Sequence, residues 1–226
     1  MMEYSNRPAS KADTAFLVAA VLEAERAPGF PVECVYERLF ETTRAQTTDL
    51  LTYALESDAR AHQLDINSFH IIEFNEAPVA CCSAWVEAHD GQPSGLKLAM
   101  LFSRWLGLRK WRERAAYISC FAACSPRRTE EALQLETFYV DPNHRRKGLT
   151  KRLIDSAVAR HARDSSNIVR CEISLFMENT VALAAYERAG FKLTWRTTGD
   201  ASCLIQIAGS KGFLQVSREL RVAGAV

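Results

Sequence analysis

Strand-like and helix-like patterns alternate along the C-terminal part of this chain, and this alternation limits the available folds more than any other feature. Apolar and β-branched residues favour strands at 133–140, 168–176, 191–197 and 212–220, and helical spacing favours helices at 149–162 and 179–189. Strands that alternate with helices are typical of α/β proteins with at least one parallel pair of strands. We therefore expect an α/β fold.

The N-terminal part adds helices and a hairpin to this plan. The segment Ser10-Lys11-Ala12-Asp13 resembles a capping box, and apolar residues then recur at helical spacing up to Ala24. A second helical region covers 35–55. Two β-rich runs, 68–74 and 79–88, are joined by a turn-like segment, which is the pattern of a hairpin.

Length and charge restrict the classes of partner. The chain has 226 residues, 48% of them hydrophobic, so we expect a single domain over 1–226. Its 28 basic and 27 acidic residues nearly cancel, so nothing in the overall charge calls for nucleic acid or an anionic membrane. Because no signal-like or membrane-spanning apolar run is visible, we expect a cytoplasmic protein without stable membrane association.

The seven cysteines carry a separate expectation. Their number is odd, and no two Cys-x-x-Cys pairs stand at the spacing of a zinc site. We therefore predict neither a disulfide framework nor a metal site, and we interpret the cysteines as reduced, mostly buried thiols.

The segment VDPNHRRKGLTKRL, from Val140 to Leu153, predicts an anion-binding turn. A strand ends here, Gly148 permits backbone angles that other residues avoid, and an apolar helical face follows from Leu149. Amides at a helix N-terminus favour anions, and Arg145, Arg146 and Lys147 add positive charge. A solvated basic run that merely opens a helix is the alternative. Neither the P-loop pattern nor the dinucleotide pattern is present, which argues against nucleoside triphosphates and NAD.

The same residues resemble motif A of the GNAT superfamily of N-acetyltransferases. Val140-x-Pro142 followed by Arg145-x-x-Gly148-x-Thr150 is similar to the family's strand ending in V-x-P and its [QR]-x-x-G-x-[GA] signature. Thr150 stands where the family usually has Gly or Ala. The resemblance implies that Arg145, Arg146, Lys147, Gly148, Leu149 and Thr150 bind the pyrophosphate of acetyl-CoA, a cosubstrate, with no metal.

A second stretch, ENTVALAAYERAGFK from Glu178 to Lys192, resembles motif B of that family. Asn179 and Tyr186 are seven residues apart, nearly two helical turns, so they share one helix face. The resemblance implies that Asn179 binds the pantetheine arm and that the Tyr186 hydroxyl protonates the departing thiolate. The alternative is that Tyr186 only packs its helix on the sheet.

The resemblance also implies the fold and the reaction. We expect a single-domain GNAT-like fold, with helices around a mixed, mostly antiparallel sheet whose parallel pair splays at the cofactor site. Backbone groups of Phe138, Tyr139 and Val140 would hold the pantetheine. The expected reaction is direct transfer of acetyl to an amine of a small molecule or peptide in a ternary complex. A homodimer is among the expected assemblies.

Glu136 is the candidate base. If the strand 133–140 alternates regularly, Glu136 lies on one face with Gln134, Phe138 and Val140. A partly buried glutamate with a raised pKa can accept a proton from an acceptor amine, whose own pKa is close to that of lysine, about 10.4. Alternatively, Glu136 orients the substrate or lies at the solvent rim. A bulge in this strand would upset the alternation.

Within this family, the segment 90–131 is expected to be a helical insertion. Its eight basic residues outnumber its four acidic ones. Residues 96–117 are candidates for a wall over the acceptor, with Trp105 and Trp111 lining a pocket. Amphipathic packing or contact with a membrane surface are the alternatives.

Two other functions stay open from the sequence. A non-catalytic acyl-CoA-binding module would keep the turn without turnover. A nucleic-acid binder would use Arg145 to Lys147 and the basic segment, although no nucleic-acid-binding motif is present.

Overall fold

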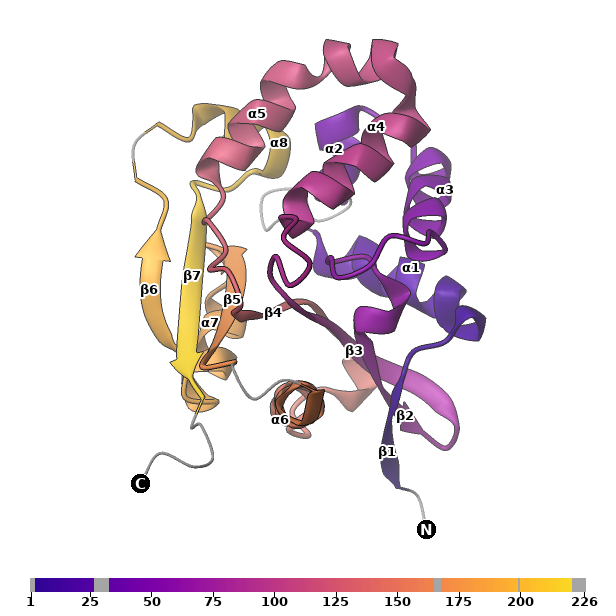
Figure 1. Ribbon diagram of the computed structural model, residues 1–226, viewed down its shortest axis with the longest axis vertical. Helices are drawn as coiled ribbons and strands as arrows, with labels where there is room; N and C mark the ends of the chain where they lie inside the picture. Colours follow the sequence, from indigo (N-terminus) through magenta and orange to yellow (C-terminus); the bar gives the residue numbers. More distant parts are fainter. Residues whose placement is uncertain (1–2, 27–32, 165–167, 199, 221–226) are drawn as a thin grey trace.

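A seven-stranded mixed sheet forms the centre of the molecule (Figure 1), whose computed structural model describes residues 3–26, 33–164, 168–198 and 200–220. The strands lie in the order β1-β2-β3-β4-β5-β7-β6. Of the strand pairs in this described part, only β4 with β5 is parallel. The strands are β1 (Tyr4–Pro8), β2 (Phe69–Phe74), β3 (Ala77–Val86), β4 (Leu133–Val140), β5 (Arg170–Phe176), β6 (Lys192–Arg196) and β7 (Phe213–Glu219).

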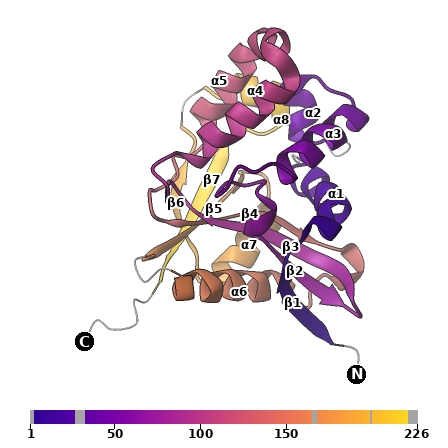
Figure 2. The ribbon, with the colours of Figure 1, turned by 45° about the vertical axis from the view of Figure 1, so that its right-hand side comes forward.

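Helices cover both faces of the sheet, as Figures 1 and 2 show. α6 and α7 lie on one face, α1 to α3 lie on the other, and α4, α5 and α8 gather above one end of the strands. The helices are α1 (Thr14–Ala24), α2 (Val35–Phe40), α3 (Arg44–Leu55), α4 (Ser94–Glu113), α5 (Ala115–Cys124), α6 (Leu149–Asp164), α7 (Thr180–Arg188) and α8 (Ser202–Ala208). The predicted α/β fold with a mostly antiparallel sheet is confirmed.

Alternation along the hairpin strands separates the two cores. Ile71 of β2 packs into the cluster of α1 to α3, whereas its neighbour Ile72 packs with Leu149 and Leu153 of α6. Successive side chains of a strand point to opposite faces, so one apolar strand supports both layers. This packing fixes the start of α6 against β2 and β3.

The parallel pair separates early. β4 is paired with β5 only where Leu133–Leu135 meet Cys171–Ile173. Beyond this point Thr137 has a positive φ of 53°, and the register with β3 shifts between Cys81 and Ser83. The regular alternation expected for 133–140 is therefore wrong past Glu136, because a bulge interrupts it. The expected splaying of the parallel pair is confirmed.

The segment 90–131 is largely helical, as expected. It forms α4 and α5, and α4 is broken at Gly107, whose φ of 77° and ψ of 154° lie outside the helical region. Glycine adopts such angles without steric cost, so the break falls at this residue. That the segment is an insertion into a single domain stays a prediction.

The expectation that all cysteines are reduced is wrong. Cys120 of α5 and Cys203 of α8 form a disulfide across a sequence separation of 83 residues. Cys124 is one helical turn after Cys120, and its Sγ lies within 4.8 Å of the other two sulfur atoms. In this disulfide form, two of these three sulfurs are not thiolate ligands for a metal.

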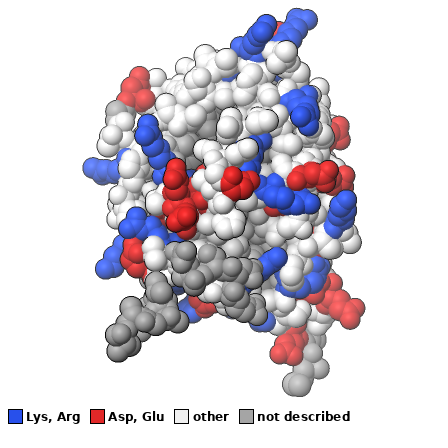
Figure 3. Space-filling view, in the orientation of Figure 1, with Lys and Arg blue, Asp and Glu red and all other residues white. Residues whose placement is uncertain are grey.

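The described surface carries mixed charge. On the face shown in Figure 3, basic and acidic side chains are interspersed, in keeping with a net charge of +1. None of the described helices has both the length and the apolar character needed to cross a bilayer.

The disulfide gives a direct test of how α5 is attached. Non-reducing peptide mapping should recover the Cys120 and Cys203 peptides as one cross-linked species, and reduction should lower the unfolding temperature because a long loop is no longer closed. Cys203→Ser should reproduce the effect of reduction, whereas Cys124→Ser should leave the cross-link in place. Recovery of both peptides as free thiols from the non-reduced protein would contradict this pairing.

Candidate active site

A cavity of about 1120 Å³ runs through the gap between β4 and β5. Its lining joins the start of α6 and the helix α7 to the end of α1 and to one side of α2, α4 and α5. The separated parallel strands supply Glu136 to Val140 on one side and Ser174 to Phe176 on the other. The bulge and the splaying therefore create a passage between the two helical layers.

One end of the cavity is the predicted anion-binding turn. After the 3-10 turn Pro142–His144, Arg146 and Gly148 have positive φ angles of 62° and 74°. A Cβ on Gly148 would meet nothing within 4 Å, so the backbone angle, and not crowding, favours glycine here. The amide of Arg152 donates to the carbonyl of Gly148 at 3.1 Å, and the amides before it point out of the helix end. This arrangement fits a pyrophosphate.

The basic residues of the turn differ in whether they line the cavity. Arg145 and Arg146 line the cavity, as do Gly148, Leu149 and Thr150. Lys147 is not among the lining residues, and its Nζ lies 5.9 Å from the centre of the Tyr4 ring. Lys147 is therefore directed away from the expected pyrophosphate.

The two motif B residues also reach the cavity. Asn179 caps α7, with its Oδ1 accepting a hydrogen bond from the Ala182 amide at 3.2 Å. Tyr186 is 6% exposed and packs between Phe138 and Phe191, with ring centroids 5.3 and 6.4 Å away. Tyr186 thus both packs its helix and lines the cavity.

The Tyr186 hydroxyl remains protonated. Burial, with smaller contributions from the charges of Cys82, Glu136 and Glu25, raises the pKa of this phenol well above its ordinary value. Within the described residues no hydrogen bond to its oxygen is found, which leaves the O–H group available to a bound molecule. A neutral phenol in this position can act as a proton donor.

The strand β4 contributes backbone groups as well as side chains to the cavity. Phe138, Tyr139 and Val140 all line the cavity. Tyr139 and Val140 pair with β3 on one edge, but β5 has already separated from the other edge. Backbone groups on that free edge therefore face the passage, where they can bind an extended polar chain.

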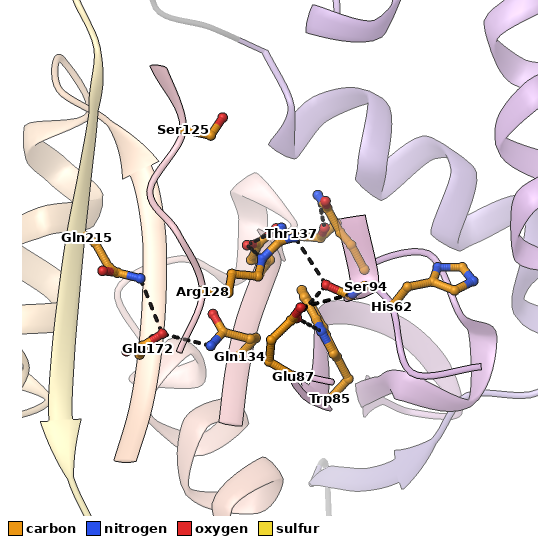
Figure 4. A network of polar contacts seen from close by, with 12 residues as sticks. His62, Trp85, Glu87, Ser94, Ser125, Arg128, Gln134, Thr137, Glu172 and Gln215 are labelled. Atoms are coloured by element: carbon orange, nitrogen blue, oxygen red, sulfur yellow. Dashed lines mark hydrogen bonds and ion pairs between the residues drawn. The ribbon is translucent and has the colours of Figure 1, made fainter. Parts of the chain in front are cut away.

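The carboxylate of Glu136 is held by an arginine. Both Nε and Nη2 of Arg128 donate to Glu136 Oε1, at 3.1 and 2.8 Å. Arg128 also donates to Ser94 Oγ at 3.2 Å, and its guanidinium lies 5.1 Å from the Trp85 ring centre. Figure 4 shows Arg128 between β4 and the start of α4. A catalytic role for Glu136 stays a prediction.

The second carboxylate, Glu25, was missed from the sequence. It follows the last residue of α1, lines the cavity and accepts a hydrogen bond from Gln63 Nε2 at 2.8 Å. Burial and the nearby charge of Glu136 raise the pKa of Glu25 from 4.5 to about 8. Glu25 stands four residues after the buried Val21, in line with the apolar stripe of the helix. An acidic residue at such a position was the feature of the sequence that could have indicated it.

The remaining lining is apolar and comes from helices distant in sequence. Trp111 lines the cavity as expected, whereas Trp105 is not in the lining and packs against the core. Tyr36 lies near Glu25, and burial, followed by the charge of Glu25, raises the pKa of Tyr36 well above its ordinary value. The cavity thus connects an anion-binding turn, a neutral phenol, a proton-accepting carboxyl group and an apolar end.

The raised pKa of Glu25 has a consequence for stability. Between pH 4.5 and about 8 the unfolded chain loses this proton while the native protein keeps it, so the group costs stability progressively as the pH rises through that window. Glu25→Gln should therefore gain unfolding temperature relative to the wild type from pH 5 to pH 9. Glu23→Gln on the same helix should show no such trend. An offset for Glu25→Gln that does not change with pH would contradict this environment.

Comparison with known proteins agrees with the fold. The model of the acetyltransferase (GNAT) family matches residues 33–191. No curated protein sequence matches the chain. A solved acetyltransferase is similar with a TM-score of 0.61 and 18% identity, over 96% of this chain and 100% of that one. A polyamine N-acetyltransferase from Drosophila melanogaster, which forms N-acetylagmatine, has a TM-score of 0.55 and 15% identity, over 96% and 100%.

The protein yncA from Salmonella typhimurium, solved with its cofactor acetyl-CoA, has a TM-score of 0.50 and 15% identity, over 98% of this chain and 96% of that one. At these identities the solved structures show a shared fold. The family match covers well over half of the chain. This chain belongs to the acetyltransferase (GNAT) family.

Proposed function

We propose that this protein is an N-acetyltransferase that transfers acetyl from acetyl-CoA to an amine in a ternary complex. One observation carries the proposal: a single cavity joins the anion-binding turn to the buried phenol of Tyr186 and the carboxyl group of Glu25. A family of acyltransferases and a structural neighbour holding acetyl-CoA support this donor. The polyamine N-acetyltransferase among the neighbours supports an amine as the acceptor.

The turn holds the donor. Amides at the start of α6 and the guanidinium groups of Arg145 and Arg146 bind the pyrophosphate, since such a helix end favours anions. Asn179 and the free edge of β4 bind the pantetheine arm. Bound acetyl-CoA supplies a thioester as the acyl donor, and its sulfur would lie near the Tyr186 hydroxyl.

Glu25 removes the proton from the acceptor. An alkylammonium group with a pKa near 10.4 must lose a proton before its nitrogen can attack. Glu25 accepts that proton, because its pKa of about 8 makes it a stronger base than an ordinary carboxylate, and it is held by Gln63. The charge of Glu136 contributes by raising the pKa of Glu25, and the charge of its partner Arg128 offsets part of this effect.

Tyr186 completes the proton balance. As the new C–N bond forms and the C–S bond breaks, the Tyr186 O–H donates its proton to the departing sulfur. The second proton, which the nitrogen loses as the amide forms, then restores the Tyr186 hydroxyl. Its raised pKa means that the proton is present throughout the physiological range.

The second candidate is the non-catalytic acyl-CoA-binding module. It would need the turn, but it has no use for a carboxyl group of raised pKa at the far end of the same cavity. Glu25 therefore favours the enzyme. The cytoplasmic location and the homodimer stay predictions.

The turn can be tested by calorimetric titration with acetyl-CoA. Arg145→Ala should raise the Kd by about tenfold, because a charge-assisted hydrogen bond to phosphate is lost. Lys147→Ala is the matched control, since Lys147 is adjacent in sequence but lies outside the cavity lining, and its Kd should stay close to that of the wild type. Equal weakening by both variants would indicate only diffuse attraction by positive charge.

The phenol can be tested by combining binding with turnover. Tyr186→Phe removes only the hydroxyl, so kcat should fall by about 10²-fold while the Kd for acetyl-CoA is unchanged. Tyr53→Phe, on α3 and outside this cavity, should alter neither quantity. If Tyr186→Phe keeps full turnover, the hydroxyl is not the proton donor and Tyr186 serves packing alone.

A further inference from the structure

The end of the cavity beyond Glu25 has a wall of apolar side chains from three helices. We call this the apolar wall, and it consists of Phe40, Leu98, Phe102, Trp111, Ile118 and Phe121. α2 contributes the first residue, α4 the next three and α5 the last two. The wall is therefore assembled from parts of the chain that lie far apart in sequence.

Aromatic contacts hold the wall in place. The Phe102 ring centroid lies 5.2 Å from that of Phe40 and 5.4 Å from that of Tyr36. Phe40 also stacks with Trp111, at 6.4 Å. On the other side Phe121 meets Phe213 edge-on, at 5.4 Å. Rings packed in this way form a fixed surface that suits an apolar body.

The charges of the lining are almost all paired at this end. Three acidic side chains, Glu23, Glu25 and Glu136, occur in the lining. Glu136 is paired with Arg128 at 2.8 Å, and the exposed Glu23 is paired with Arg26 at 2.7 Å. Within the described residues Glu25 forms no ion pair. The cavity therefore offers a cationic acceptor one carboxyl group that has no ion-pair partner among these residues, although the charge of Arg128 acts on it.

A second cation on the acceptor would have no partner. If one ammonium group lies at Glu25, the rest of the molecule lies against the apolar wall. An ammonium group placed there would lose its hydration without gaining a counter-ion, which costs far more than burying a methyl group. The wall thus selects against acceptors that are cationic at both ends.

Building on the proposed function, we infer that the acceptor is an amine with a single cationic group carried on an apolar body, such as an arylalkylamine or alkylamine. Diamines and guanidino-amines of the same length are rejected. The acceptor class thus differs from the agmatine acetylated by the polyamine N-acetyltransferase of similar fold.

The test compares acceptors of matched size. Hexylamine and 1,5-diaminopentane have the same number of heavy atoms and differ only by a methyl group in place of a second ammonium group. Initial rates with acetyl-CoA, with 2-phenylethylamine and agmatine alongside, should give a kcat/KM at least about tenfold higher for each singly charged amine than for its doubly charged counterpart.

A variant of the wall should change this preference. Ile118→Asp places a carboxylate on the wall, so the ratio of kcat/KM for 1,5-diaminopentane over hexylamine should rise by at least about tenfold. Ser119→Asp is the matched control, because Ser119 is exposed on the same helix and outside the lining, and its ratio should stay at the wild-type value. Leu98→Asp, on α4, serves if Ile118→Asp does not fold by circular dichroism.

The outcomes distinguish the acceptor preference from the acetyltransferase activity itself. Equal or better use of the diamine by the wild-type enzyme would overturn the inference and leave the acetyltransferase proposal intact. Binding of acetyl-CoA without acetylation of any amine in the panel would overturn the proposed function and this inference with it. A change in preference in Ser119→Asp equal to that in Ile118→Asp would show that the wall does not set specificity.

Discussion

The separation of β4 from β5 after three paired residues is the constraint on which the rest of this structure depends. A parallel pair that continued would close the sheet and leave no route between its two helical layers. The bulge at Thr137 turns β4 away, and the N-terminal ends of α6 and α7 then face the opening. The sheet loses hydrogen bonds at this point, but the opening forms a cavity with backbone donors at one end. Bulges are often found next to active sites.

The chemistry of the cavity comes from local charge, since the chain as a whole is nearly neutral. Positive charge and amides gather at the start of α6, whereas the carboxyl groups of Glu25 and Glu136 are near enough for the charge of one to affect the pKa of the other. Arg128 forms an ion pair with Glu136 and so reduces the repulsion between the two carboxyl groups. It also connects β4 to the start of α4 through its hydrogen bond to Ser94. Two neighbouring carboxyl groups therefore occupy different states: one is ion-paired, and the other has a raised pKa and can exchange a proton.

The features that the sequence could predict are those encoded over short distances. The turn at Gly148 depends on one backbone conformation, and the shared face of Asn179 and Tyr186 depends on helical geometry. Glu136 was only partly predictable, because a bulge cannot be read from alternation and its partner Arg128 lies in an irregular loop. Glu25 could not be predicted, because its raised pKa and its hydrogen bond depend on Glu136 and Gln63, which are remote in sequence.

The different positions of the two tryptophans and the disulfide could not be predicted for similar reasons. Trp105 and Trp111 were treated as equivalent, but the break at Gly107 changes the helical phase between them, so only Trp111 reaches the cavity. Cys120 and Cys203 are brought together by the packing of α5 on α8, and no spacing rule joins cysteines 83 residues apart.

The pH dependence of kcat/KM tests most directly the claim that Glu25 accepts the proton, since this quantity reports the ionisation of the free enzyme and free acceptor. With hexylamine as acceptor, the wild-type value should rise with pH and level off near 8. Glu25→Gln should lose this inflection and fall by about 10²-fold or more. Glu136→Gln should keep the inflection at a lower pH, because one cause of the raised pKa is removed. An inflection near 8 that persists in Glu25→Gln but disappears in Glu136→Gln would contradict the account and make Glu136 the base.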